Sequence, residues 1–178
     1  MVFIKDMHSA PLPVMFVMYK GLYDFDKLYK AIEDWFNAYM YEYHEDVFKN
    51  KEDNIGDELE IKLYGDKKID EYAKYRIDVH ILNSDAEYVE KEINGKIKML
   101  IRGRIRIQIK PLCEFDYQKQ YEGSEALKNL GGEEGFMSKH VMDQDISFKY
   151  IDDMYYHAYT LQALIKDVLN MDTAGNNY

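Results

Sequence analysis

The chain has 178 residues, a net charge of −10 and 47% apolar residues. This length suits one domain with its own hydrophobic core, and this apolar content excludes a chain that is disordered throughout. The single cysteine, Cys113, excludes an internal disulfide and favours a reducing compartment. No apolar run approaches the ~20 residues of a membrane-spanning helix, so we expect a cytoplasmic protein without membrane contacts.

The N-terminal quarter predicts two short strands followed by a long helix. Residues 1–20 contain two apolar stretches around a proline-containing bend, typical of a strand pair or of an arm that leaves the domain. From about Phe25 to Phe48, apolar residues recur at three- and four-residue spacing, and Asp24 can cap the first turn. We therefore expect one long helix whose apolar stripe, including Trp35, faces the core.

Strict alternation of apolar and polar residues marks the middle of the chain. It covers residues 58–63, 74–81 and 101–110 and predicts antiparallel strands that bury one face. Gly65-Asp66 is interpreted as a turn. Gly103 interrupts the last alternating stretch and indicates a bulge or a bend.

A hairpin is predicted at Asn94-Gly95, which is a strong signal for a two-residue turn. It should join a strand near residues 86–93 to the strand that begins at Lys96. With the three alternating stretches, this completes a four-stranded meander.

The C-terminal third is irregular and then helical. Residues 114–145 lack periodicity and are rich in glycine, so we expect a loop with a short helix near 124–130. A final helix is predicted from Asp152 to Met171, and the polar tail at 172–178 should be loose. The whole chain, 1–178, is therefore a single α+β domain: an antiparallel β-meander packed against a long helix from the N-terminal half and a C-terminal helix.

No motif for catalysis, a metal or a cofactor is present, which favours a role other than that of an enzyme. Glycine-rich phosphate loops are absent, and the five histidines do not form a zinc-binding pattern. The best acid–base candidates, Asp78 and His80, fit a surface cross-strand pair better than a catalytic dyad. The acidic residues at 42–46 are interpreted as a solvated face, and Cys113 as a small buried hydrophobe.

Charge is distributed unevenly along the chain. Residues 21–60 hold twelve acids and four bases, whereas residues 91–110 hold seven bases and one acid. One strand should therefore carry a basic stripe on an acidic molecule. The net charge argues against general nucleic-acid binding, which needs a broad positive surface.

Two hypotheses account for this basic stripe. The arginines could pair with Asp78, Glu58 or Glu60 of the same sheet. Alternatively, the stripe could contact an acidic patch on another copy of the chain, with tyrosines adding apolar area at the edge. The candidate interaction residues are Arg102, Arg104, Arg106, Lys110, Tyr41 and Tyr43.

The order of an amphipathic helix, an antiparallel meander and a C-terminal helix resembles the ring-forming tail-terminator and neck proteins of tailed phages. Residues 19–36 and 156–173 also resemble small uncharacterised archaeal proteins, which implies no function. The phage resemblance implies a structural subunit of a homo-oligomeric ring or filament, held by protein–protein contacts with copies of itself and with other proteins of the assembly, in the cytoplasm or in a virion. The element order also resembles the helix-grip fold, which implies a small-molecule binder or enzyme with an apolar cavity.

Overall fold

The structure, a computed structural model, describes residues 9–51, 57–93, 95–115, 117–118 and 147–171. The predicted helix near 124–130 and the tail at 172–178 lie outside these residues, as does the first part of the predicted N-terminal strand pair. The described elements are β1 (Ser9–Pro11), β2 (Met15–Tyr23), α1 (Phe25–Ala38), β3 (Glu42–Lys51), β4 (Asp57–Lys68), β5 (Ala73–Ile93), β6 (Lys96–Phe115), a π-helical turn η1 (Ser147–Ile151) and α4 (Asp152–Val168).

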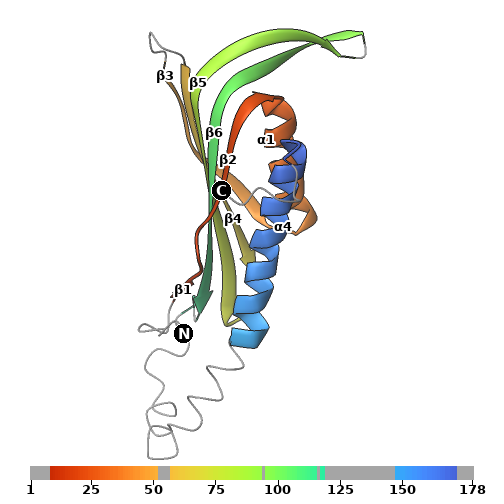
Figure 1. Cartoon of the computed structure of the whole chain (residues 1–178). Coiled ribbons are helices and arrows are strands. Elements are labelled where there is room, and N and C mark those ends of the chain that lie inside the picture. The colour runs from red at the N-terminus through yellow and green to blue at the C-terminus, as the bar shows by residue number, and fades with distance from the viewer. Residues whose placement is uncertain (1–8, 52–56, 94, 116, 119–146, 172–178) are drawn as a thin grey trace, which may run out of the picture.

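All six strands form one antiparallel sheet, which confirms the predicted α+β class. The strand order is β1-β6-β5-β4-β3, and β2 pairs with β6 further along its length. Consecutive strands β3 to β6 are neighbours, as in a meander. Both helices lie on the same side of the sheet (Figure 1), so no helix of the described residues covers the other sheet face.

The core is built from the alternating residues that the sequence indicates. Val79 is opposite Ile109, Ile81 is opposite Ile107, and all four side chains are buried under the helices. Full burial of a side chain of this size contributes roughly 1.5–3 kcal/mol to folding. The predicted strand pairing and inward face are therefore confirmed.

Helix α1 begins as predicted and ends ten residues earlier than predicted. Asp24 Oδ1 accepts a hydrogen bond from the Lys27 backbone N–H at 3.0 Å, which caps the first turn. Trp35 is buried, as expected. The helix stops at Ala38, and the chain turns at Met40, where φ is 58°. The prediction of helix up to Phe48 is wrong.

Residues 42–51 form strand β3 because a partner strand is available. β3 pairs with β4 over its whole length, with a bulge between Glu45 and Val47. The tyrosines at 39, 41 and 43 suit either structure locally, because aromatic residues occur at strand period as well as on the helical stripe. Ladder hydrogen bonds to β4 decide the choice.

The predicted turn at Gly65-Asp66 is also wrong, since both residues lie inside β4. The chain reverses instead near Asp70, whose carboxylate accepts hydrogen bonds from the backbone N–H groups of Tyr72 and Ala73 at 2.9 and 2.8 Å. Asx turns of this kind give the backbone an alternative to continuing the strand.

The longest feature is the β5–β6 hairpin, whose far end bends across the ends of the helices (Figure 1). Gly95, with φ of +74°, lies in the connection between the two strands, as the hairpin prediction requires. The predicted strand at 86–93 is the second half of β5. We call residues 86–101, excluding the undescribed position 94, the arm.

Candidate functional site

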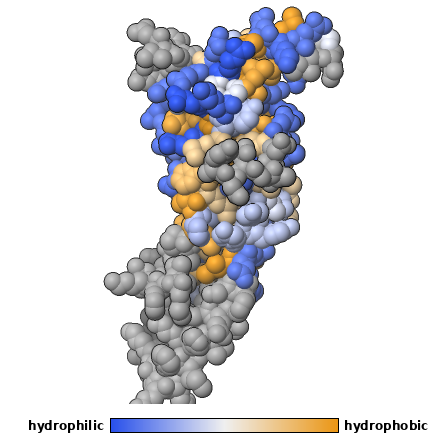
Figure 2. Space-filling view, in the orientation of Figure 1, coloured by the Kyte–Doolittle hydropathy of each residue, from blue (hydrophilic) through white to orange (hydrophobic). Residues whose placement is uncertain are grey.

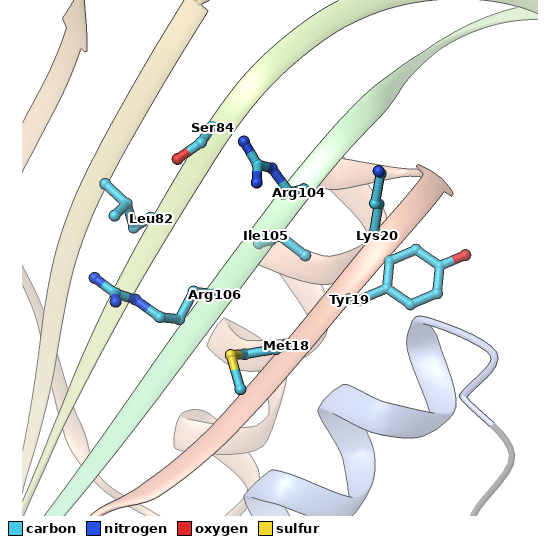
Figure 3. Close-up of a pocket in the computed structure, with 8 residues that line it drawn as sticks. All are labelled: Met18, Tyr19, Lys20, Leu82, Ser84, Arg104, Ile105 and Arg106. Carbon is cyan, nitrogen blue, oxygen red and sulfur yellow. The ribbon is translucent and has the colours of Figure 1, made fainter. Parts of the chain in front are cut away.

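The predicted basic residues of β6 lie on the sheet face opposite α1 and α4. Ile105 and Ile107 of β6 are buried on the helix side, so Arg104 and Arg106 emerge on the opposite side, where both are exposed. Figure 3 shows these arginines beside side chains of β2 and β5. Arg102 is exposed too.

Two cross-strand rows organise this surface. Met18 of β2 is opposite Arg106 of β6, which is opposite Leu82 of β5. In the next row, the corresponding residues are Lys20, Arg104 and Ser84. These six residues border a shallow hollow of about 440 Å³. We call this surface the basic sheet face, and it consists of Met18, Lys20, Leu82, Ser84, Arg104 and Arg106.

The arginines nearest the arm pair with acids next to a bulge in β5. Arg104 Nε donates to Asp85 Oδ2 at 2.8 Å, and Arg102 lies 3.5 Å from a carboxylate oxygen of Glu87. The hypothesis of internal pairing therefore holds for these two arginines, although it named other acids.

Two of the acids named in that hypothesis, Asp78 and Glu60, have other partners. Asp78 accepts from Arg76 Nε at 3.0 Å, while Glu60 lies 2.9 Å from His80 Nε2. Asp78 and His80 thus belong to separate surface pairs, which is the non-catalytic interpretation. Lys62 is 3.1 Å from Glu60, and hydrogen bonding from Lys62 is the largest influence lowering the pKa of that carboxyl.

Two cations of the basic sheet face have no acidic partner among the described residues. Neither Lys20 nor Arg106 makes a hydrogen bond or an ion pair there, and both are exposed. Between them lies Met18, which is 69% exposed, and Phe16 is exposed one row further along. The surface therefore combines unpaired positive charge with exposed apolar side chains.

The remaining predicted interaction residues are not part of this surface. Lys110 is exposed on the same sheet face, further along β6. Tyr41 is buried in the core, so it cannot supply apolar area at an edge. Tyr43 is half-buried, and its hydroxyl is 2.7 Å from that of Tyr29. Burial raises the pKa of the Tyr43 phenol.

A buried polar cluster around His157 was not anticipated from the sequence. The Tyr41 hydroxyl lies 2.8 Å from His157 Nδ1, and the Tyr75 hydroxyl donates to Asp153 Oδ2 at 3.1 Å. Burial lowers the pKa of His157 against the opposing effect of Asp153, and it raises the pKa values of Tyr41 and Tyr75. The i,i+4 spacing of Asp153 and His157 on α4 is the signal that could have indicated this pair.

Aromatic rings pack around this cluster, which is typical of a polar network that stabilises the fold. The ring centroids of Tyr39 and Trp35 lie 5.0 and 6.4 Å from that of His157. Cys113 is also buried, and burial raises the pKa of its thiol to about 12, so it is an inert hydrophobe at neutral pH.

A second hollow of about 440 Å³ lies on the helix side, beside the start of α1. Aromatic and aliphatic side chains from α1, the sheet and the arm line it. We call it the α1 groove; its principal lining residues are Phe25, Tyr29, Phe48, Leu59, Tyr88 and Met99.

The described residues contain no group of three or more His, Cys, Asp or Glu side chains that could hold a metal ion. In the same part of the chain, no helix is long and apolar enough to cross a membrane. No protein-family model matches this chain, and no curated protein is significantly similar to it.

Proposed function

We propose that this protein is a structural subunit that associates with copies of itself, through the basic sheet face, into a ring or filament. The observation that carries the proposal is a pair of cations, Lys20 and Arg106, which have no partner among the described residues and lie beside the exposed Met18. A sheet face with exposed apolar side chains is typical of a protein interface.

The charge distribution supports a contact between different surfaces of two copies. Chains with a net charge of −10 repel at long range, so association needs local complementarity. A basic face on an acidic molecule supplies it, because acids outnumber bases in the chain as a whole. Contacts between two different surfaces are heterologous, and they propagate into rings or filaments. Such an assembly would suit the cytoplasm or a virion, as the resemblance to phage tail proteins implies.

The first experiment measures the mass of the purified protein as a function of concentration, by mass photometry and light scattering. We expect an oligomer that dissociates on dilution. The triple variant R102E/R104E/R106E should be monomeric and should keep the wild-type circular dichroism spectrum. The matched control is K27E/K30E/K68E, which changes the net charge equally at exposed residues outside the basic sheet face and should still assemble.

The comparison between these two variants separates local from global electrostatics. If both variants dissociate equally, general repulsion is responsible and the basic sheet face is not the interface. A wild-type protein that stays monomeric at high micromolar concentration contradicts the assembly itself.

A second candidate function, binding of an apolar small molecule, is favoured by the α1 groove. Its lining is mostly aromatic and aliphatic, as in ligand pockets. The space under α4, where a helix-grip cavity would lie, is filled by buried Tyr75, Met154 and Leu161. A solvatochromic naphthalene dye tests this candidate: saturable binding that F48S abolishes would support it, and dye binding that F48S leaves unchanged would contradict it.

A further inference from the structure

We propose that the partner of the basic sheet face is the arm of the next copy, which docks through one acidic and apolar side of its β-ribbon. This inference rests on the proposed assembly and names the counter-surface. The contact is heterologous, because it joins two different surfaces of the same chain.

The ribbon register defines that side of the arm. Tyr88 is opposite Ile101, and the next pairs on the same side are Glu90 with Met99 and Glu92 with Ile97. Directly opposite residues of an antiparallel pair share a face. We call the exposed set the acidic arm face, and it consists of Tyr88, Glu90, Glu92, Ile97 and Met99.

The acidic arm face carries two acids, three aromatic or aliphatic side chains and no base. Ile97 is 74% exposed and Met99 is 51% exposed, which is unusual for aliphatic side chains on two neighbouring positions of one face. Glu90 and Glu92 are exposed and make no ion pair within the described part of the chain. Figure 2 shows hydrophobic surface among hydrophilic residues at the projecting end of the molecule.

Basic residues occupy the other side of the ribbon, where they contact the chain's own helices. Lys98 Nζ lies 3.1 Å from Asp24 Oδ2 at the start of α1. Lys91 is opposite Lys98, and both line a hollow with Leu100, which is buried. This attachment holds the arm in place. Tyr88 and Met99 of the acidic arm face border the α1 groove and remain exposed.

A bulge sets the direction of the arm. Asp85 and Ala86 of β5 together oppose Gly103 of β6, and Asp85 has a positive φ of 58°. A Cβ at Gly103 would lie 3.0 Å from the Asp85 carbonyl oxygen, so glycine is needed for this close approach. The prediction of a bulge or bend at Gly103 is confirmed.

The bend makes an intramolecular contact between the two surfaces impossible. The arm curves over the helix side of the sheet (Figure 1), whereas the basic sheet face lies on the opposite side. In one copy, the arm and the basic sheet face therefore lie on different sides of the sheet. A neighbour stacked on the helix side places its basic sheet face against the arm.

The two surfaces match in composition. Two unpaired acids, Glu90 and Glu92, meet two unpaired bases, Lys20 and Arg106, and Met99 meets Met18 at the centre. In this contact, the apolar side chains supply the attraction. The charges disfavour face-to-face and arm-to-arm contacts, because these would bring like charges together.

Charge reversal tests the pairing. The arm variant E90K/E92K and the face variant K20E/R106E should each raise the dissociation constant of the assembly by about tenfold or more. An equimolar mixture of the two variants should assemble again, because each contact then joins opposite charges. The chain that carries all four changes should assemble alone. The control E71K/D167K, which alters two exposed acids outside the arm, should behave as the wild type does.

Cross-linking tests the same contact independently. An oxidised mixture of M18C and M99C should yield a disulfide-linked dimer on a non-reducing gel, while M18C mixed with M40C should not. Met40 is as exposed as Met18, and the native Cys113 is buried, so only the introduced thiols can react. In the double variant M18C/M99C, a ladder that ends at a fixed size indicates a ring, and an open ladder indicates a filament.

The outcomes distinguish this inference from the assembly itself. Loss of the oligomer in the face variant, with no effect of the arm variant and no rescue in the mixture, overturns the arm as partner and leaves the assembly standing. A monomeric wild type overturns both.

Discussion

Gly65 of β4 lies directly under an aromatic ring of α1. A Cβ at this position would lie 2.5 Å from two ring carbons of Phe36, far inside van der Waals contact. The glycine is therefore required by packing between helix and sheet, and its neighbours on either side are Tyr43 and Ile77. This close approach explains a residue that looks like turn chemistry in the sequence.

We expect Gly65→Ala to lower the free energy of unfolding by about 1–3 kcal/mol, because Phe36 or the backbone must shift. Gly21→Ala is the matched control: its Cβ would meet only the hydroxyl end of Tyr19, which can move. The control should be neutral or slightly stabilising, since alanine reduces unfolded-state entropy. Urea unfolding of both variants measures the difference, and equal losses would contradict the role of Phe36.

His157 should make stability depend on pH. Burial lowers its pKa in the folded protein below the unfolded value of 6.5, so the folded state binds the proton more weakly. The contribution is fully present above pH 6.5 and is lost as the pH falls through the folded pKa. The wild type should therefore lose more stability than His157→Gln between pH 7.5 and pH 5.5. Denaturation curves that give the same loss of stability for both proteins over this pH range would refute this expectation.

At the scale of elements, β6 combines a structural half and an exposed half. Residues from Ile101 onward contribute the buried isoleucines of the sheet, whereas Ile97 and Met99 project from the arm. The bulge opposite Gly103 separates the two halves. One strand therefore contributes to both folding and the proposed contact.

Paired substitutions in β6 should separate these contributions. Ile107→Ala should cost about 2–5 kcal/mol, because the side chain is fully buried in a central strand. Ile97→Ala, the same change at a 74% exposed position, should alter stability by less than about 0.5 kcal/mol and should weaken assembly. Thermal melts at concentrations where the protein is monomeric measure the first effect. An unchanged melting temperature in Ile107→Ala would refute the strand register.

At the scale of the whole molecule, the proposed assembly has a direction, because each copy would use a basic surface for one contact and an acidic surface for the next. The exposed arginines of β6 lie on the sheet face opposite the helices, and the arm lies on the helix side. The net charge of −10 opposes association at long range, so the proposed assembly needs an orientation that aligns complementary surfaces.

Salt should weaken the wild-type assembly. Exposed ion pairs contribute at most about 1 kcal/mol each, and the screening length falls from ~10 Å at 0.1 M salt to ~3 Å at 1 M. Two or more such pairs predict a dissociation constant about tenfold higher at 1 M salt, measured by light scattering. The variant with all four charges exchanged should show the same salt dependence, and a salt-independent constant would mean that apolar contacts alone hold the assembly.

The amino-acid sequence by itself determined the class of fold, the inward faces of β4, β5 and β6, the start of α1 and the bend at Gly103. These features are local: period-two alternation marks the buried side of a strand wherever its partner lies. Tertiary structure alone decided that residues 42–51 form a strand, because the pattern there suits helix and strand and only pairing with β4 selects one. It also decided which cations remain unpaired. Arg104 finds Asp85 only because the bulge brings that carboxylate beside it, whereas Arg106, two residues along, faces Met18 and Leu82. Ion pairing across strands depends on register and on backbone irregularities, which composition and spacing do not specify.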